Sequence, residues 1–180
     1  MELLVVVETI YRCVFLDRDG VINKYLENDY VKNIHEFEVL ESFVDFWEKH
    51  KKYYKFIVIT NQSGINKGIV NYRFFVDLSM YLVNRFNLSA LYFCPHKEEE
   101  NCRCRKPKNW MLKKAIERFS VDVENSYFIG DSLVDFLCAD SMKIKFILTL
   151  TGKTKKEDVE KWIKKPFKIV ENLSLLMLPT

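Results

Sequence analysis

Two aspartates separated by one residue follow the first apolar run of the chain, in the stretch Asp17-Arg18-Asp19-Gly20. In extended backbone, residues i and i+2 face the same way, so both carboxylates could enter one site. Two carboxylates this close raise each other's pKa unless a cation lies between them. The spacing therefore indicates acid–base or metal chemistry, although a turn with solvated acids explains most isolated pairs of this kind.

More carboxylates follow a later apolar run. Asp131 comes directly after it, and Asp135 follows four residues on, at helical spacing. Three or four carboxylates at strand ends form a hard oxygen cage that suits Mg²⁺. The combination indicates a metal site more strongly than either acidic pair alone.

Two further stretches offer groups that bind phosphate. Thr60-Asn61-Gln62-Ser63-Gly64 combines hydroxyl and backbone N–H donors beside a glycine, and Arg105-Lys106-Pro107 adds a guanidinium fork and a point charge. Each stretch alone is typical of a turn or a surface patch. Together with the aspartates they meet the needs of phosphoryl transfer, namely a nucleophile, a proton donor, a metal and a charge clamp.

Four soft metal ligands lie close together in the chain. They are Cys94, His96, Cys102 and Cys104. Three thiolates and one imidazole suit tetrahedral Zn²⁺, and because they fill all four positions we expect a structural site. Its role would be to order the loop that delivers Arg105 and Lys106. The alternative is three free thiols beside an incidental histidine.

A repeated pattern of short apolar runs and helical stripes would position these residues. The runs lie at residues 14–16, 56–59, 91–93, 127–129 and 146–148, and each ends in a polar residue or glycine. Runs without alternation fit strands buried on both faces, as in parallel sheets. Apolar stripes of helical period lie between them, one of them after a capping residue, Asn71. Thr154 and Glu157 resemble a capping box before a last stripe that reaches Ile163.

Strands that alternate with helices predict an α/β fold with a Rossmann-like doubly wound parallel sheet. In such sheets the ligand site lies outside the carboxyl ends of the strands, where the polar residues would converge. We expect residues 1–180 to form one domain, with a core at about 11–152 and a zinc loop at 94–104. Residues 1–10 precede the first regular strand and either add an edge strand or form a tail.

The composition excludes several classes of protein. The chain has 180 residues, 48% of them hydrophobic and 29% charged, which argues against disorder. A net charge of +3 is too small to indicate a nucleic-acid surface. No apolar run approaches the ~18–20 residues of a membrane span, and residues 3–7 do not form a signal peptide, so we expect a cytoplasmic protein. Five cysteines, an odd number, argue against a disulfide framework. His35 and His50 lie in no motif and are interpreted as structural or surface residues.

The arrangement of motifs resembles that of haloacid-dehalogenase (HAD) superfamily phosphatases. Residues 15–23 match the first motif, Thr60 the second, Lys106 the third and residues 130–135 the fourth. The match covers residues 11–152. Each interval between motifs holds only one helix-and-strand unit, so no cap domain fits. The crevice is expected to be open, with the loop at 23–33 and the zinc loop beside it. Tyr25 and Tyr30 in the first loop suit contact with a sugar, and a plain surface loop fits them equally well.

Within the superfamily the closest resemblance is to heptose-1,7-bisphosphate phosphatases, and histidinol-phosphate phosphatases are the near rival. The resemblance implies that Asp17 attacks phosphorus and that Asp19 serves as acid and then base. Mg²⁺ would be held by Asp17, the backbone carbonyl of Asp19 and Asp131. The charge of the phosphoryl group would be balanced by Thr60, Arg105 and Lys106, and the substrate would also contact Asn61, Gln62 and Ser63. Ser132 departs from the lysine common in heptose enzymes.

The implied function is hydrolysis of a small phosphorylated metabolite by a monomer, without nucleic-acid or membrane partners. The expected substrate is heptose 1,7-bisphosphate, and the product, heptose 1-phosphate, would feed lipopolysaccharide synthesis. The first alternative is another small-molecule phosphatase, such as one for histidinol phosphate. The second is a non-enzymatic phosphoacceptor module similar to a response-regulator receiver. The third, a zinc-bearing nucleic-acid module, is disfavoured by the modest net charge.

Overall fold

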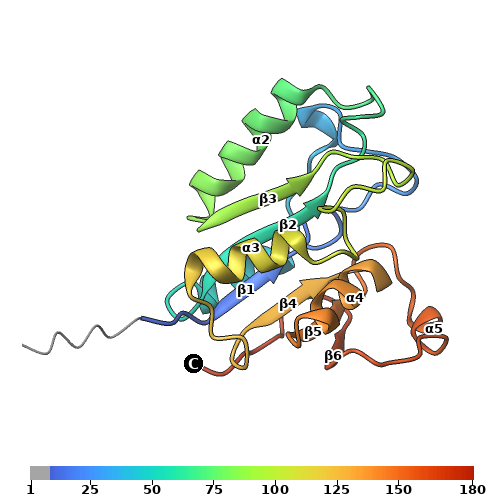
Figure 1. Cartoon of the computed structure of the whole chain (residues 1–180). Helices are drawn as coiled ribbons and strands as arrows, with labels where there is room; N and C mark the ends of the chain where they lie inside the picture. The colour runs from blue at the N-terminus through green and yellow to red at the C-terminus, as the bar shows by residue number, and fades with distance from the viewer. Residues whose placement is uncertain (1–8) are drawn as a thin grey trace, which may run out of the picture.

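The computed structural model describes residues 9–180, so the apolar run at residues 3–7 lies outside the described part. One sheet forms the centre of the molecule (Figure 1). Its strands are β1 (Cys13–Leu16), β2 (Lys55–Asn61), β3 (Ala90–Cys94), β4 (Tyr127–Gly130), β5 (Lys145–Thr149) and β6 (Lys168–Val170). All neighbours pair in parallel, in the order β3-β2-β1-β4-β5-β6. The predicted doubly wound parallel sheet is confirmed.

The strand order places a topological switch point between β1 and β4. The chain winds outward from β1 to β3 and then returns to the other side of β1 to begin β4. At such a point the connections leave in opposite directions, which opens a crevice at the carboxyl ends of the strands. Asp17 follows β1 and Asp131 follows β4, so both predicted carboxylates flank the crevice.

Helices cover both faces of the sheet. On one face, α1 (Glu41–His50) and α2 (Tyr72–Arg85) contribute Phe43, Phe46 and Leu82 to a core with Val14 and Leu16. On the other face lie α3 (Trp110–Phe119) and α4 (Leu133–Ser141), as Figure 1 shows. Their residues Met111, Leu112 and Phe136 pack in one core with Phe15 and Ile57. Alternate residues of β1 and β2 enter opposite cores, which explains why these strands read as continuous apolar runs.

The core continues beyond residue 152. Strand β6 pairs with β5, and Leu173, Leu176 and Leu178 are buried against the face that carries α1. His50 is also fully buried there, and its Nε2 accepts a hydrogen bond of 3.0 Å from the backbone N–H of Leu178. The last ten residues therefore form a strap over one core rather than a loose tail.

The prediction of the last helix was wrong about where the helix begins and how long it is. The short helix α5 (Lys156–Val159) begins one residue later than the capping box predicted, and the carboxylate of Asp158 accepts from the backbone N–H of Lys155 at 3.3 Å. Thr154 is instead buried and donates its backbone N–H to the carbonyl of Asp131 at 3.1 Å. Ile163, expected on the apolar stripe, is fully exposed. A tertiary contact to the aspartate loop has overridden the local pattern.

The other elements are regular. The short 3₁₀ helix η1 (Ile34–Glu36) lies in the long connection from β1 to α1. The predicted cap of α2 is confirmed, because the Asn71 side chain accepts from the backbone N–H groups of Arg73 and Phe74. Among residues 9–180, no helix is both long and apolar enough to cross a bilayer.

Candidate active site

Three carboxylates converge at the switch point. Asp17, Asp131 and Asp135 each place an oxygen within 4.8 Å of the others. Asp135 lies in the first turn of α4 and approaches Gly130 so closely that a Cβ there would lie 2.5 Å from the Asp135 Cβ. A Cβ on Gly152 would overlap the Asp131 carboxylate. Both glycines are therefore needed for the backbone to approach the acids.

Lys106 lies among these acids as their internal counter-charge. Its Nζ is 2.9 Å from Asp17 Oδ1 and 2.6 Å from Asp135 Oδ1, and it donates to the carbonyl of Ile59 at 2.6 Å. Burial on its own would lower the pKa of Lys106, but the charges of Asp135 and Asp17 raise it above its ordinary value. The ammonium therefore stays charged, although the side chain is buried.

One ammonium does not balance three carboxylates. The pKa of Asp17 is raised to about 6, chiefly by burial and also by the negative charges of Asp135 and Asp19, against the opposing charge of Lys106. Burial and the charges of Asp135 and Asp17 also raise the pKa of Asp131 well above its ordinary value. Within the described residues, Asp17 Oδ1 is buried, and the Lys106 ammonium at 2.9 Å is the one polar partner found for it. This excess of hard, buried oxygen donors fits a divalent cation such as Mg²⁺.

The Asp19 side chain is not part of this cluster of three, although it lines the same cleft. Arg18 Nη2 lies 2.8 Å from each of its oxygens, Asn23 Nδ2 donates at 3.0 Å and Gln62 Nε2 at 2.8 Å. Burial raises the pKa of Asp19, but the charge and hydrogen bonds of Arg18, with those of Asn23 and Gln62, lower it further than burial raises it. The carboxylate is therefore held ionised beside the cluster of three.

The residues after β2 are bound to the rest of the site through their side chains. Thr60 is buried, and its hydroxyl accepts from Gln62 Nε2 at 3.0 Å. Asn61 is joined to the backbone of Lys106 by two hydrogen bonds of 3.0 and 3.1 Å. The Ser63 hydroxyl lies 3.1 Å from the hydroxyl of Tyr30. In this structure Asn61 and Gln62 therefore position other groups of the site.

Several contributors were not predicted as site residues. Arg18 and Asn23 surround Asp19, and the backbone N–H of Lys153 donates to Asp131 Oδ2 at 2.7 Å. Arg18 and Asn23 lie inside the first motif, so proximity in sequence was a usable signal. The Gly152-Lys153 turn follows β5. Its position after a strand was the one feature of the sequence that could have identified it as part of the site.

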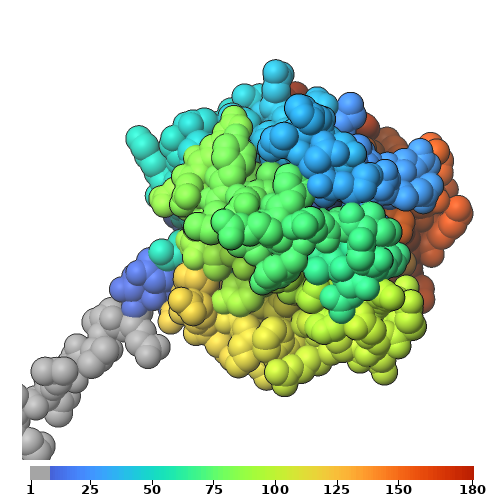
Figure 2. Space-filling model, turned by 90° about the horizontal axis from the view of Figure 1, so that it is seen from above, coloured from blue at the N-terminus to red at the C-terminus, as the bar shows by residue number. Residues whose placement is uncertain are grey.

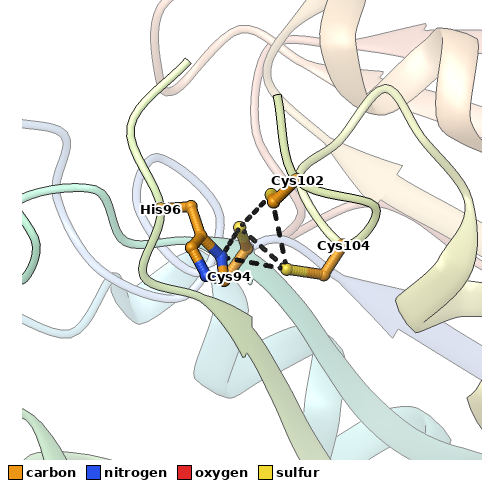
Figure 3. A group of neighbouring side chains, drawn as sticks. All are labelled: Cys94, His96, Cys102 and Cys104. Carbon is orange, nitrogen blue, oxygen red and sulfur yellow. Dashed lines mark hydrogen bonds between the residues drawn. The ribbon is translucent and has the colours of Figure 1, made fainter. Parts of the chain in front are cut away.

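The four predicted zinc ligands lie together at the end of β3 and in the loop that follows (Figure 3). The three Sγ pairs are 3.2 to 3.5 Å apart, and His96 Nδ1 lies 3.5 Å from Cys94 Sγ and 3.3 Å from Cys104 Sγ. All five cysteines are free thiols. Zinc–sulfur bonds of about 2.3 Å in a tetrahedron imply sulfurs about 3.8 Å apart, close to the spacing found. The cluster fits Zn²⁺, and Arg105 and Lys106 follow its last ligand directly.

A cleft of about 750 Å³ lies over the acids. Its walls come from the loop after β1, the turn after β2, the zinc loop, the residues after β4 and Lys153, and include Asp17, Tyr30, Lys67, Arg105 and Asp131. The first three segments form one side of the molecule in the space-filling view, in blue, green and yellow-green (Figure 2). Asn66 Nδ2 donates to Glu100 at 3.0 Å and ties the second segment to the zinc loop. The cleft is wide enough for a small sugar phosphate.

Comparisons with known proteins agree with this geometry. The sequence model of the HAD-hydrolase-like family matches residues 103–176. A D-glycero-beta-D-manno-heptose-1,7-bisphosphate 7-phosphatase of Helicobacter pylori (strain J99) is 40% identical, covering 79% of this chain and 85% of that protein. A D-glycero-alpha-D-manno-heptose-1,7-bisphosphate 7-phosphatase of Campylobacter jejuni is 35% identical over 82% of this chain and 87% of that one.

A solved structure has the same fold. The D,D-heptose 1,7-bisphosphate phosphatase of B. bronchiseptica, complexed with magnesium and phosphate, superposes with a TM-score of 0.81 at 25% identity. The superposition covers 91% of this chain and 94% of that one. The likeness extends over nearly the whole of both chains.

Proposed function

Because the chain belongs to the D-glycero-D-manno-heptose-1,7-bisphosphate 7-phosphatase family of HAD-like hydrolases, we propose that it removes the 7-phosphate of heptose 1,7-bisphosphate. The product, heptose 1-phosphate, is a precursor of surface heptose in lipopolysaccharide. The observation that carries the proposal is the meeting of Asp17, Asp131 and Lys106 at the switch point of the sheet. We also propose that it acts as a monomer.

Mg²⁺ is the proposed cofactor of the reaction. The carboxylates of Asp17 and Asp131 and the backbone carbonyl of Asp19 would hold it. When bound, it withdraws charge from the phosphoryl oxygens as a Lewis acid. Asp135 accepts from the Ser132 hydroxyl at 2.5 Å and pairs with Lys106, so its part is to hold that lysine against Asp17.

In the first step, an oxygen of Asp17 attacks phosphorus and the bond from phosphorus to the sugar oxygen breaks. This forms an aspartyl-phosphate on Asp17 and releases the sugar oxygen, which Asp19 protonates. Lys106 and Arg105, with the Thr60 hydroxyl, balance the charge of the moving phosphoryl group. Asp19 is ionised in the free protein, so it must gain a proton as substrate binds. The approaching phosphate dianion raises its pKa by like-charge repulsion.

In the second step, Asp19, left ionised by the first step, accepts a proton from water. That water attacks phosphorus, the bond to Asp17 breaks and inorganic phosphate leaves. Arg18, Asn23 and Gln62 suit this half of the cycle because they stabilise the ionised form of Asp19.

The remaining predicted residues orient the substrate and the loop. We propose that residues 61–63, chiefly the Ser63 hydroxyl and the backbone N–H groups, contact the phosphate or sugar together with Arg105. Zn²⁺ on Cys94, His96, Cys102 and Cys104 would order the loop before Arg105. Structural zinc in small peptides binds with about 10–16 kcal/mol of apparent free energy, which is enough to order a loop without a core of its own.

A phosphate-release screen tests the proposal. We expect Mg²⁺-dependent release from heptose 1,7-bisphosphate, tried as both anomers because relatives of both kinds match, with a kcat/KM well above that for histidinol phosphate. A preference for histidinol phosphate would show that the proposed substrate is wrong, while the proposed reaction mechanism would still apply. A long-lived phosphoenzyme without turnover would instead favour the receiver-like alternative.

A further inference from the structure

The loop that follows β5 holds Asp131, one of the proposed metal ligands, at two points. The backbone N–H of Lys153 donates to Asp131 Oδ2 at 2.7 Å, and the backbone N–H of Thr154 donates to the Asp131 carbonyl at 3.1 Å. Groups that hydrogen-bond to a metal ligand orient it and tune its affinity for the ion. The position of residues 151–154 therefore determines how Asp131 presents its oxygens.

The side chain of Thr151 connects this loop to the turn after β1. Its hydroxyl donates to the carbonyl of Gly20 at 2.6 Å, and Gly20 directly follows Asp19. The hydroxyl of Thr149 lies 2.8 Å from the same oxygen and must be the donor there, because the Thr151 proton is used on Gly20. Thr149 is the last residue of β5 and is fully buried. Two consecutive hydrogen bonds thus run from the end of β5 to the turn that contains Asp19.

The backbones of the two loops lie in direct contact around the Asp131 carboxylate. A Cβ on Gly20 would lie 2.6 Å from Asp131 Oδ2 and 2.9 Å from the Cα of Gly152. Gly20 also has a φ of +83°, in the left-handed region that glycine tolerates. Within residues 9–180, the hydrogen bond from Thr151 is the one that joins residues 149–154 directly to residues 18–24. Without it, packing alone would hold the two loops together.

We propose that Thr151 is a positioning residue for the Mg²⁺ site. Its hydrogen bond to Gly20 fixes the distance between the Asp19 carbonyl and the Asp131 carboxylate, two of the proposed ligands. The inference rests on the proposed function, because these groups must hold the ion together with Asp17. Thr151 does not line the cleft, so it acts on the affinity for Mg²⁺ through the two loops and leaves the reacting groups in place.

Binding of Mn²⁺ in the absence of substrate, followed by electron paramagnetic resonance of the free ion, tests the inference directly. For Thr151→Val, which keeps the shape of the side chain but lacks the hydroxyl, we expect the Kd for Mn²⁺ to rise about 10- to 100-fold, as loss of a group that orients a metal ligand typically causes. Thr151→Ser keeps the hydroxyl and should stay within about 3-fold of the wild type. Thr149→Val removes the donor behind it and should raise the Kd about 3- to 10-fold, which decides the matter if Thr151→Val does not fold. Asp131→Asn identifies the signal of this site, since it lacks the charge of one ligand.

The dependence of turnover on Mg²⁺ supplies a second measurement. The Mg²⁺ concentration for half-maximal phosphate release should rise in Thr151→Val by the same factor, with kcat at saturating Mg²⁺ within about 2-fold of the wild type. A residue that only supports the fold would not give a loss of rate that added Mg²⁺ restores. Without Mg²⁺, the Tm of Thr151→Val should be lower by less than about 4 °C, the effect of one lost hydrogen bond. Ser79→Ala is the matched control, because it removes a hydroxyl-to-carbonyl hydrogen bond of 2.7 Å inside α2 and should leave both metal constants unchanged.

Three results separate the inference from the proposed function. If the wild type and Asp131→Asn bind Mn²⁺ equally, the proposed metal site is wrong and the inference falls with it. If the wild type binds more tightly than Asp131→Asn but Thr151→Val binds as the wild type does, the inference is wrong and the proposed function stands. The inference is also wrong if Thr151→Val loses kcat that saturating Mg²⁺ does not restore, because Thr151 would then act on the chemical step.

Discussion

Asn61 and Lys106 are joined by a reciprocal pair of hydrogen bonds. The backbone N–H of Lys106 donates to Asn61 Oδ1 at 3.0 Å, and Asn61 Nδ2 donates to the Lys106 carbonyl at 3.1 Å. Asn61 is the last residue of β2, and Lys106 is the cation that contacts Asp17. The two hydrogen bonds therefore fix Lys106, which lies in a loop, against the end of strand β2. Asn61 acts as a positioning residue for Lys106.

Replacing Asn61 tests this relationship. We expect Asn61→Ala to lower kcat about 10- to 100-fold with a smaller change in KM, because small displacements of a charge clamp cost this much. Asn109→Ala is the control, since the Asn109 side chain donates to the hydroxyl of Ser141, the last residue of α4, and not to Lys106. Steady-state kinetics with a sugar bisphosphate and Mg²⁺ measure both variants. An unchanged kcat in Asn61→Ala would show that Lys106 needs no such support.

We expect loss of the zinc cluster to lower the stability of the fold directly and to lower activity only as a consequence. We expect about one zinc per chain in the purified protein, and its loss together with a lower Tm in Cys102→Ser. Activity should fall as a consequence, because Arg105 and Lys106 follow the cluster directly. Metal analysis and thermal unfolding give the two measurements. Cys138→Ser, at a buried cysteine outside the cluster, should lose stability but keep its zinc. A zinc-free Cys102→Ser protein with normal Tm would contradict the structural role.

His50 should make the stability of the fold depend on pH. Burial lowers its pKa from the ordinary 6.5, while its hydrogen bond to the Phe46 carbonyl opposes this and Lys49 adds to it. Nδ1 faces that carbonyl at 2.7 Å and Nε2 accepts from Leu178, so the neutral ring fits and protonation at Nε2 breaks the second bond. A depressed folded-state pKa means that the stabilisation is complete above pH 6.5 and is lost as the pH falls through the folded pKa.

Chemical denaturation between pH 8 and 5 measures this effect. We expect the free energy of unfolding to fall by about 1–3 kcal/mol, the cost of an unsatisfied buried group, with a flatter profile in His50→Gln. His35→Gln is the matched control, because His35 is exposed in η1. Identical pH profiles for the wild type and His50→Gln would show that protonation of His50 does not weaken the packing of the last ten residues.

Much of this architecture follows from short-range patterns. Continuous apolar runs such as residues 56–59 predict parallel strands, and parallel strands place their carboxyl ends at one edge, so the meeting of Asp17 and Asp131 was predictable. The zinc ligands were predictable for a different reason, since they are close in sequence and of one chemical type. In both cases one physical rule links the spacing of the residues to their position.

Contacts between segments distant in sequence were not predictable in this way. Nothing local marks Thr154 as a donor to Asp131, or Leu178 as a donor to His50, because both bonds are made by backbone groups. The half-buried strand β3 lies at the edge of the sheet, although its apolar sequence resembles that of a central strand. Asn61 and Gln62 looked like phosphate ligands from composition, yet their amides are used on Lys106 and Asp19.

Asp17 is the proposed nucleophile, and the proposed reaction depends on it more than on any other residue. The direct measurement is phosphate release from heptose 1,7-bisphosphate in the presence of Mg²⁺, by the wild type and by Asp17→Asn, with folding of both checked by thermal unfolding. We expect turnover by the wild type and a loss of at least about 10³-fold in kcat for Asp17→Asn with its fold intact. Turnover by folded Asp17→Asn at the wild-type rate would contradict the central claim.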